Sequence, residues 1–313
     1  MSLRGAASFL ARPPDRPQGA SPRALEHRTG VSYETAWARR YPVRLVRAMV
    51  LDNLTIPLVR VVASPKVLGR HHLEPIEGPV IVVANHASHL DASILLAALP
   101  EQRRHQSVVA AAADYFFDRH WKAAISAFGL GAIPMERVKV NRKSADAAAA
   151  LVEAGWSLLI FPEGGRSPDG WGQEFKGGAA YLSKRCRVPV VPAHIRGTRS
   201  VLPKGGDGVR ARLRPATTEV RFGRAMSAGE GEDARRFSGR IETAIAVLAD
   251  EAETDWWSAK LRGAGLKVGD PSAFRGPEVA PWRRSWELPE SADPVSRRAR
   301  GSEPARWPPR GDR

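Results

Sequence analysis

The segment Pro79–Asp91, which reads PVIVVANHASHLD, decides the fold because it leads from a buried strand into a helix. The apolar run over 79–84 is almost continuous, as is typical of a strand that helices cover. The apolar pattern over 91–99 predicts a helix that begins at Asp91. A strand, a short polar turn and a helix in this order are the building unit of an α/β sheet.

The polar turn contains a histidine and an aspartate that suit acid–base chemistry. His86 and Asp91 are five residues apart, about 140° around an ideal helix, so both side chains cannot lie on one helical face. They can meet if His86 ends the strand and Asp91 lies in the first helical turn. The carboxylate then accepts the proton on one ring nitrogen, and the other nitrogen can take a proton from a hydroxyl group. The pair is therefore a candidate general base.

The same turn also has a purely structural interpretation. Ser88 and Asp91 have the spacing of a capping box, in which side chains bind backbone N–H groups at the start of a helix. Serine and aspartate are frequent at such positions whether or not catalysis takes place nearby. Taken alone, the motif leaves the catalytic and the capping role open.

Strand and helix patterns alternate along the rest of the chain. This alternation predicts an α/β fold with a mixed, largely parallel sheet covered by helices. The predicted strands are 79–84, 107–111, 157–161, 188–193 and 219–222, and the predicted helices are 91–99, 118–128, 144–154, 177–185 and 232–260.

A segment near the N-terminus combines apolar and basic residues at helical spacing. Charged residues interrupt the stretch Val43–Ala63, so it falls short of the ~20 mostly apolar residues that span a bilayer. Pro57 predicts the end of one helix or the start of the next. The pattern fits a helix in a bilayer interface and equally a helix packed on the protein's own core. The apolar positions are Val43, Val46, Met49, Val50 and Leu54, and the predicted polar stripe is Arg40, Arg44 and Arg47.

The chain is strongly basic. Its 313 residues include 48 Lys and Arg against 33 Asp and Glu, a net charge of +15. Such a surface favours a polyanion, either an anionic bilayer or a nucleic acid. No nucleic-acid recognition module is apparent, so a basic nucleic-acid-binding protein is the weaker alternative.

Composition also indicates where the folded domain begins and ends, and it excludes some kinds of site. Residues 1–30 and 271–313 are rich in Pro and Arg and are predicted to be disordered extensions of a domain over 31–270, with membrane-proximal helices at 33–63. The single cysteine, Cys186, excludes an internal disulfide and a cysteine-based metal cluster. The first residues lack the pattern of a secretory signal, so we expect a cytoplasmic location.

Three later segments contain residues that suit a phosphate-bearing ligand. GAIPMER, 131–137, places Arg137 after a tight apolar turn, where its guanidinium could bind a phosphate through two hydrogen bonds. FPEGGRS, 161–167, follows a predicted strand, and its paired glycines allow close approach of a ligand. VPVVPA, 188–193, is a stiff apolar strand that suits one wall of a pocket.

Together and in this order, NHASHLD, GAIPMER, FPEGGRS and VPVVPAHI resemble the motifs of the glycerolipid acyltransferase family typified by bacterial 1-acyl-sn-glycerol-3-phosphate acyltransferases. The resemblance covers about 43–260 and implies a glycerol-3-phosphate acyltransferase-like fold. It implies that His86 of the HxxxxD motif is the general base and that Asp91 orients it. It further implies that Arg137 binds the acceptor's phosphate, that Glu163 and Gly164 shape the acceptor site, and that Arg166 supports it electrostatically.

The resemblance also implies the reaction. The expected enzyme moves a fatty acyl group from acyl-CoA or acyl carrier protein to the hydroxyl of lysophosphatidic acid, giving phosphatidic acid in phospholipid biosynthesis. It needs no cofactor and no metal. We expect it to act as a peripheral protein on the cytoplasmic face of an anionic membrane.

The chain departs from the family pattern after its second predicted strand. Many members carry a lysine there, near the phosphate, whereas this chain has alanines at 110–113. A different lysolipid acceptor therefore stays open, and Arg103 or Arg104 is a possible substitute for the lysine. A smaller departure is Gly165, where threonine is usual. His89, at a position that the family leaves open, is expected to line the pocket or face solvent rather than to catalyse.

Overall fold

The structure, a computed structural model, describes residues 30–136, 142–165, 175–202, 215–254, 256 and 259–260. Within these residues seven strands form one sheet in the order β1-β7-β6-β2-β5-β3-β4. Neighbouring strands are parallel except β6 and β7, so the predicted mixed, largely parallel sheet is confirmed. The strands are β1 Lys66–Leu68, β2 Ile81–Ala84, β3 Ser107–Ala112, β4 Ala132–Met135, β5 Ser157–Ile160, β6 Val190–Arg196 and β7 Glu219–Phe222.

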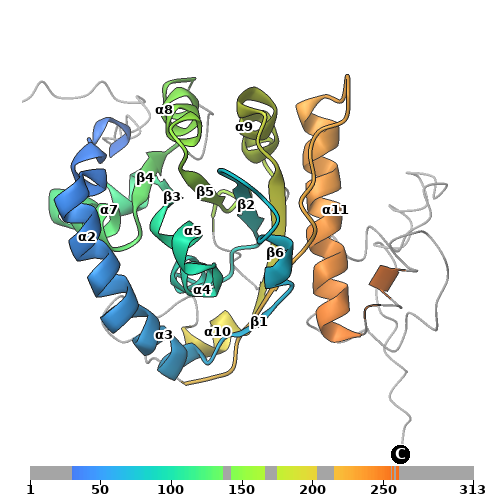
Figure 1. Ribbon diagram of the computed structural model, residues 1–313, viewed down its shortest axis with the longest axis horizontal. Helices are drawn as coiled ribbons and strands as arrows, with labels where there is room; N and C mark the ends of the chain where they lie inside the picture. The colour runs from blue at the N-terminus through green and yellow to red at the C-terminus, as the bar shows by residue number, and fades with distance from the viewer. Residues whose placement is uncertain are drawn as a thin grey trace, which may run out of the picture.

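Helices cover both faces of the sheet (Figure 1). The two faces of β2 belong to different cores, because side chains alternate along a strand. Val82 packs in the core that includes α3 and α4, and Ile81 packs in the core that includes α8, α9 and α11. The bounds are α3 Ile56–Ala63, α4 Asp91–Ala98, α8 Arg142–Glu153, α9 Gly178–Cys186 and α11 Ala234–Glu253.

The remaining elements are short or peripheral, and several were not predicted. The stretch expected to be a turn before Arg137 contains β4, because Ala132 and Ile133 are buried and pair in parallel with β3. The helix predicted to reach residue 260 ends at Glu253. The other elements are η1 Gly30–Ser32, η2 Ala36–Arg39, α2 Tyr41–Val50, η3 Leu51–Thr55, η4 Arg70–His72, α5 Glu101–His105, α6 Ala113–Phe116, α7 His120–Gly129 and α10 Thr198–Val201. The predicted terminal extensions lie outside the described residues, apart from Gly30.

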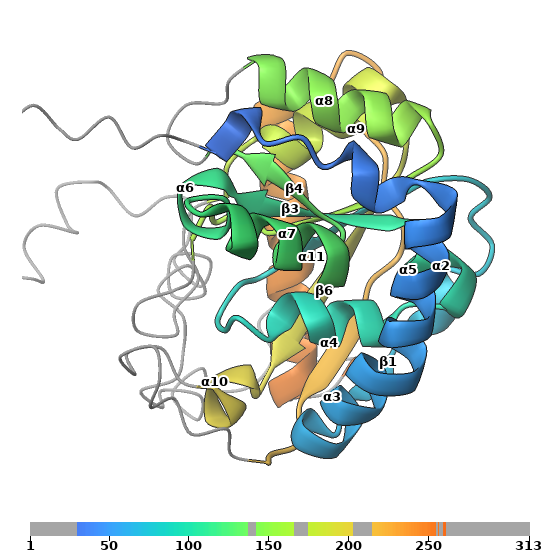
Figure 2. The ribbon, with the colours of Figure 1, turned by 90° about the vertical axis from the view of Figure 1, so that its left-hand side faces the viewer.

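The N-terminal helices α2 and α3 lie along one side of the domain (Figure 2). Pro57 is the second residue of α3, so it begins the second helix. The outer surface of these two helices and of η3 between them is largely apolar. Its exposed large apolar side chains are Tyr41, Leu45, Val46, Met49, Leu54, Leu58 and Val61. No helix among the described residues has the length and apolar character needed to span a membrane.

The predicted polar stripe on α2 is wrong at one of its three positions. Arg47 faces inward and is only 3% exposed, whereas Arg44 lies over the ring of Trp156 at 5.8 Å. Nε and Nη2 of Arg47 have no hydrogen-bond partner in the described part of the chain. Burial lowers the pKa of Arg47 to about 10. The helix thus turns apolar side chains outward and a guanidinium inward, the reverse of an ordinary surface helix.

Candidate active site

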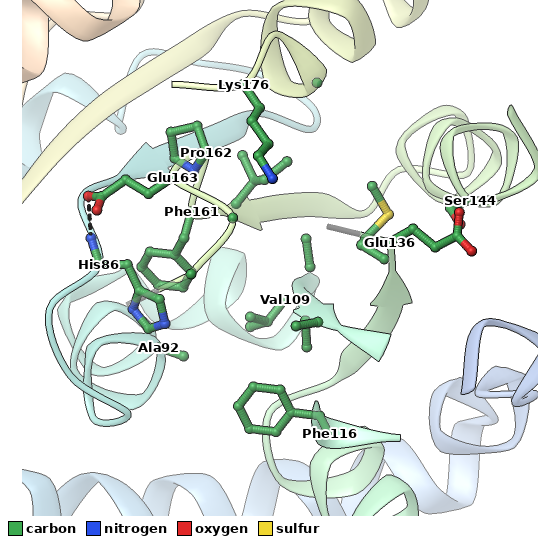
Figure 3. Close-up of a pocket in the computed structure, with 18 of the residues that line it drawn as sticks. His86, Ala92, Val109, Phe116, Glu136, Ser144, Phe161, Pro162, Glu163 and Lys176 are labelled. Carbon is green, nitrogen blue, oxygen red and sulfur yellow. Dashed lines mark hydrogen bonds between the residues drawn. The ribbon is translucent and has the colours of Figure 1, made fainter. Parts of the chain in front are cut away.

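A cavity of about 880 Å³ opens where β2, β3 and β5 end at their carboxyl termini (Figure 3). This edge of a parallel sheet is where α/β folds commonly bind ligands. His86 follows β2, the segment Phe161–Gly165 follows β5, and Ala110–Ala112 end β3. The NHASHLD and FPEGG segments, far apart in the sequence, therefore meet at one cavity.

His86 and Asp91 form the contact that their spacing predicts. Nδ1 of His86 lies 2.9 Å from Oδ2 of Asp91, whose side chain is fully buried. Because Asp91 begins α4 and His86 follows β2, the turn between the two elements brings them together. Nδ1 is engaged by the carboxylate, so Nε2 is the nitrogen available for proton transfer.

The hydroxyl of Ser88 donates to the carbonyl of Leu202, so the predicted capping box forms only through the carboxylate of Asp91. Its Oδ2 accepts hydrogen bonds from the backbone N–H groups of Ala87 at 2.7 Å and Ser88 at 2.8 Å. The same oxygen thus organises the turn and contacts the imidazole. The two interpretations that the sequence left open do not exclude each other.

Residues from other strands fix the backbone around His86. The backbone N–H of His86 donates to Oε1 of Glu163 at 2.9 Å. The Asn85 side chain pairs with both backbone groups of Ile195, donating to its carbonyl at 2.9 Å and accepting from its N–H at 2.7 Å. Phe161 stacks on the His86 ring at 4.4 Å between centroids. Sequence reasoning missed the role of Asn85, although its place in the motif, directly before His86, was a signal.

Glu163 and Gly164 both line the cavity, but Glu163 does more than shape an acceptor site. Its side chain is buried, with the residue 4% exposed, and it holds the backbone of His86. Gly164 has a φ of +69°, a left-handed conformation that glycine adopts without strain. Arg137 and Arg166 lie outside the described residues, so their predicted roles remain predictions.

The arginines before β3 do not replace the missing lysine. Arg103 donates to the carbonyls of Ile76 and Gly78. Arg104 donates to Leu96 and pairs with Asp52 at 2.7 Å. Both precede β3 and are absent from the cavity lining, so the suggested substitution is wrong.

His89 lines the cavity, which is one of the two positions that the sequence predicted for it. Its Nε2 lies 3.0 Å from the hydroxyl of Tyr115, and the two rings stack with centroids 5.1 Å apart. Lys122 lies over the Tyr115 ring at 5.5 Å. His89 thus belongs to an aromatic wall of the cavity.

Ligand-type side chains also cluster at the opposite end of the sheet. Oxygen and nitrogen atoms of Asp52, Glu101 and His105 lie within 4.8 Å of one another. Asp52 already pairs with both Arg104 and His105, the latter at 2.9 Å. This group joins the segment between α2 and α3 to α5, which is a structural role.

Comparison with known proteins identifies the family of the central region. Residues 64–196 match the family model described as Acyltransferase. A chloroplastic 1-acyl-sn-glycerol-3-phosphate acyltransferase of Brassica napus is 30% identical over 149 residues, which cover 45% of this chain and 40% of the relative. The alpha form of 1-acyl-sn-glycerol-3-phosphate acyltransferase of Homo sapiens is 29% identical over 157 residues, covering 48% of this chain and 50% of the relative.

A solved structure is also similar. It is the crystal structure of the 1-acyl-sn-glycerophosphate (LPA) acyltransferase PlsC from Thermotoga maritima, with 21% identity, a TM-score of 0.48, and coverage of 68% of this chain and 82% of that chain. The present chain spans two fifths to a half of the length of the two curated relatives named above.

Proposed function

Residues 64–196 form a domain of the acyltransferase family, and from this premise we propose that the chain transfers a fatty acyl group from an acyl thioester to the hydroxyl of lysophosphatidic acid. The donor is acyl-CoA or acyl carrier protein, and the product is phosphatidic acid for phospholipid biosynthesis. The observation that carries the proposal is the contact of His86 with the buried Asp91 beside a large cavity. The names of the curated relatives support the choice of acceptor.

His86 and Asp91 are the proposed catalytic residues. Nε2 of His86 removes the proton from the acceptor hydroxyl as its oxygen attacks the thioester carbonyl. The tetrahedral intermediate then collapses, the carbon–sulfur bond breaks, and the thiolate takes the proton from the imidazolium. Asp91 keeps Nε2 unprotonated in the resting state and stabilises the imidazolium that forms, as in the histidine–aspartate pair of serine hydrolases. No covalent enzyme intermediate is needed because the thioester is already activated.

The acceptor's phosphate needs positive charge near the cavity. We assign Arg137 to bind it through two parallel hydrogen bonds and Arg166 to support it electrostatically. Arg137 follows Glu136, which lines the cavity, and Arg166 follows Gly165, which also lines it. These neighbours support the assignment of both arginines.

The acceptor is held in a bilayer, so the enzyme must reach the membrane surface. We propose that the apolar outer surface of α2 and α3 inserts part-way into the cytoplasmic leaflet while the basic exterior is attracted to anionic lipid. Seven large apolar side chains are exposed on these helices and η3: Tyr41, Leu45, Val46, Met49, Leu54, Leu58 and Val61. An apolar patch of this kind on a monomer marks a contact surface.

A second candidate acceptor is a lysolipid with another headgroup. It is favoured by the alanines at the end of β3, which line the cavity where many family members carry a lysine. A screen of the purified protein separates the two candidates. It would compare lysophosphatidic acid with neutral-headgroup lysolipids, using both acyl-CoA and acyl carrier protein donors. We expect lysophosphatidic acid to be the best acceptor, and no acylation of any lysolipid would refute the proposal.

A further inference from the structure

The cavity contains a basic side chain that the chemistry above leaves without a role. Lys176 lies just before α9 and lines the same cavity as His86. In Figure 3 its ammonium group extends into the cavity, with His86 toward one side and Glu136 toward the other. Among the described residues of the cavity lining, Lys176 is the sole lysine or arginine.

The glycine turn after β5 accommodates this lysine. A Cβ atom at position 164 would lie 2.6 Å from Nζ and 2.9 Å from Cε of Lys176, closer than van der Waals contact permits. The backbone N–H of Lys176 donates to the carbonyl of Pro162 at 3.0 Å, which attaches the lysine to the same turn. Gly164 thus has a left-handed backbone conformation that favours glycine, and the end of the lysine side chain passes close to its Cα atom.

The side of the cavity formed by the end of β3 has no cation, among the residues described there, that could bind a phosphate. Ala110, Ala111 and Ala112 line the cavity there and offer no charge. A phosphate at the cavity therefore needs a cation from another element. An ammonium group is strongly attracted to a phosphate in a partly enclosed site, where water screens charge less than in bulk solvent.

We propose that Lys176 binds the phosphate of the acceptor and supplies the positive charge that the alanines at the end of β3 cannot supply. The acceptor is accordingly a lysolipid whose headgroup carries an anionic phosphate. This inference rests on the proposed acyltransferase function. Its rival is a structural role, in which Lys176 only balances the carboxylates of Glu136 and Glu163, which line the same cavity.

Steady-state kinetics of the full chain separate the two roles. With lysophosphatidic acid varied at saturating acyl donor, Lys176→Ala should raise the acceptor KM by about tenfold or more, while the donor KM stays within about twofold. Lys176→Arg should keep much of the wild-type affinity because it keeps the charge. Lys184→Ala is the matched control, because Lys184 lies on α9 outside the cavity lining and donates to the carbonyl of Glu232. Lys176→Gln keeps most of the side chain without its charge, and it replaces the alanine variant if that variant folds poorly.

Two further comparisons test the charge itself. Inorganic phosphate should compete with the acceptor in the wild type and compete about tenfold more weakly in Lys176→Gln. Acylation of an uncharged monoacylglycerol should be nearly equal in the two proteins. An unchanged acceptor KM, or equal losses with charged and uncharged acceptors, would overturn the inference, as would a wild type that acylates only acceptors without a phosphate. A wild type that acylates no lysolipid refutes the proposed function instead.

Discussion

The backbone N–H of His86 donates a hydrogen bond to Oε1 of Glu163 across 2.9 Å, although the two residues are 77 positions apart. Asp91 holds the ring of the same histidine at Nδ1. His86, just after β2, is therefore held by the carboxylate of Glu163 at its backbone N–H and by the carboxylate of Asp91 at its ring. Since Glu163 is 4% exposed, its contact with His86 forms in a poorly solvated environment, where hydrogen bonds are strong.

This contact predicts that Glu163 acts on turnover more than on acceptor binding. Glu163→Ala leaves a part-buried N–H without its partner, so we expect kcat to fall about tenfold and stability to drop by ~1–3 kcal/mol. Glu163→Gln retains an acceptor oxygen and should lose less of both. Kinetics and thermal melts of the two variants provide the check. A raised acceptor KM at unchanged kcat would instead show direct substrate binding by Glu163.

Asp91 has two functions that substitution can separate. Asp91→Asn keeps one oxygen for the N–H groups of Ala87 and Ser88 but removes the negative charge beside His86. We expect kcat to fall by ~10²–10⁴-fold, because the imidazole loses the partner that sets its tautomer. The melting temperature should fall by much less than in Asp91→Ala, which also loses the hydrogen bonds to the backbone of Ala87 and Ser88. Equal kcat in Asp91→Asn and the wild type would show that Asp91 has only a structural role in the turn before α4.

The sequence predicts the catalytic pair well because the constraint is local. A strand end, a five-residue interval and a helix start place His86 and Asp91 within reach of each other without any knowledge of the tertiary fold. The five predicted strands are also found, because buried parallel strands are continuous apolar runs. β4 escaped prediction because Gly131 and Pro134 read as a turn, and only its pairing with β3 makes it a strand.

Long-range relationships could not be predicted in this way. The hydrogen bonds from His86 to Glu163 and from Asn85 to Ile195 join residues 77 and 110 positions apart. The orientation of α2 was equally inaccessible, because amphipathic spacing defines two faces without saying which one meets the core. Arg47 was expected in the solvent-facing stripe, and tertiary packing buries it.

The buried guanidinium of Arg47 predicts a stabilising substitution. Burial lowers its pKa to about 10, so the folded state disfavours the charged form that is present at neutral pH. Arg47→Met fills similar space without a charge and should raise stability by about 1–3 kcal/mol. Arg40→Met, at an exposed position just before the same helix, should change stability by less than about 0.5 kcal/mol. A lower melting temperature for Arg47→Met would show that the guanidinium makes a stabilising interaction.

The apolar outer surface of α2 predicts how the protein meets lipid. Val46 is 52% exposed and Met49 is 65% exposed, so Val46→Asp and Met49→Asp should weaken vesicle binding without unfolding the domain. Binding should increase with anionic lipid content and decrease with salt. Co-sedimentation with vesicles of neutral and anionic composition measures both effects.

A charge control separates insertion from simple repulsion. Thr243→Asp adds the same charge to an exposed position on α11 and should leave vesicle binding close to that of the wild type. If Val46→Asp unfolds the protein, the outer surface of α2 contributes to its core. Salt-insensitive binding to neutral vesicles would contradict the electrostatic contribution, and an absence of vesicle binding would reject a membrane-surface protein.

The most direct test of the account is acyl transfer to lysophosphatidic acid by His86→Ala, measured beside His89→Ala. Both histidines line the cavity, but Asp91 contacts His86, whereas His89 lies beside the hydroxyl of Tyr115. We predict that His86→Ala loses ~10²–10⁴-fold in kcat with an intact fold, while His89→Ala stays within about tenfold of the wild type. Near-normal turnover by folded His86→Ala protein would contradict the assignment of His86 as the general base.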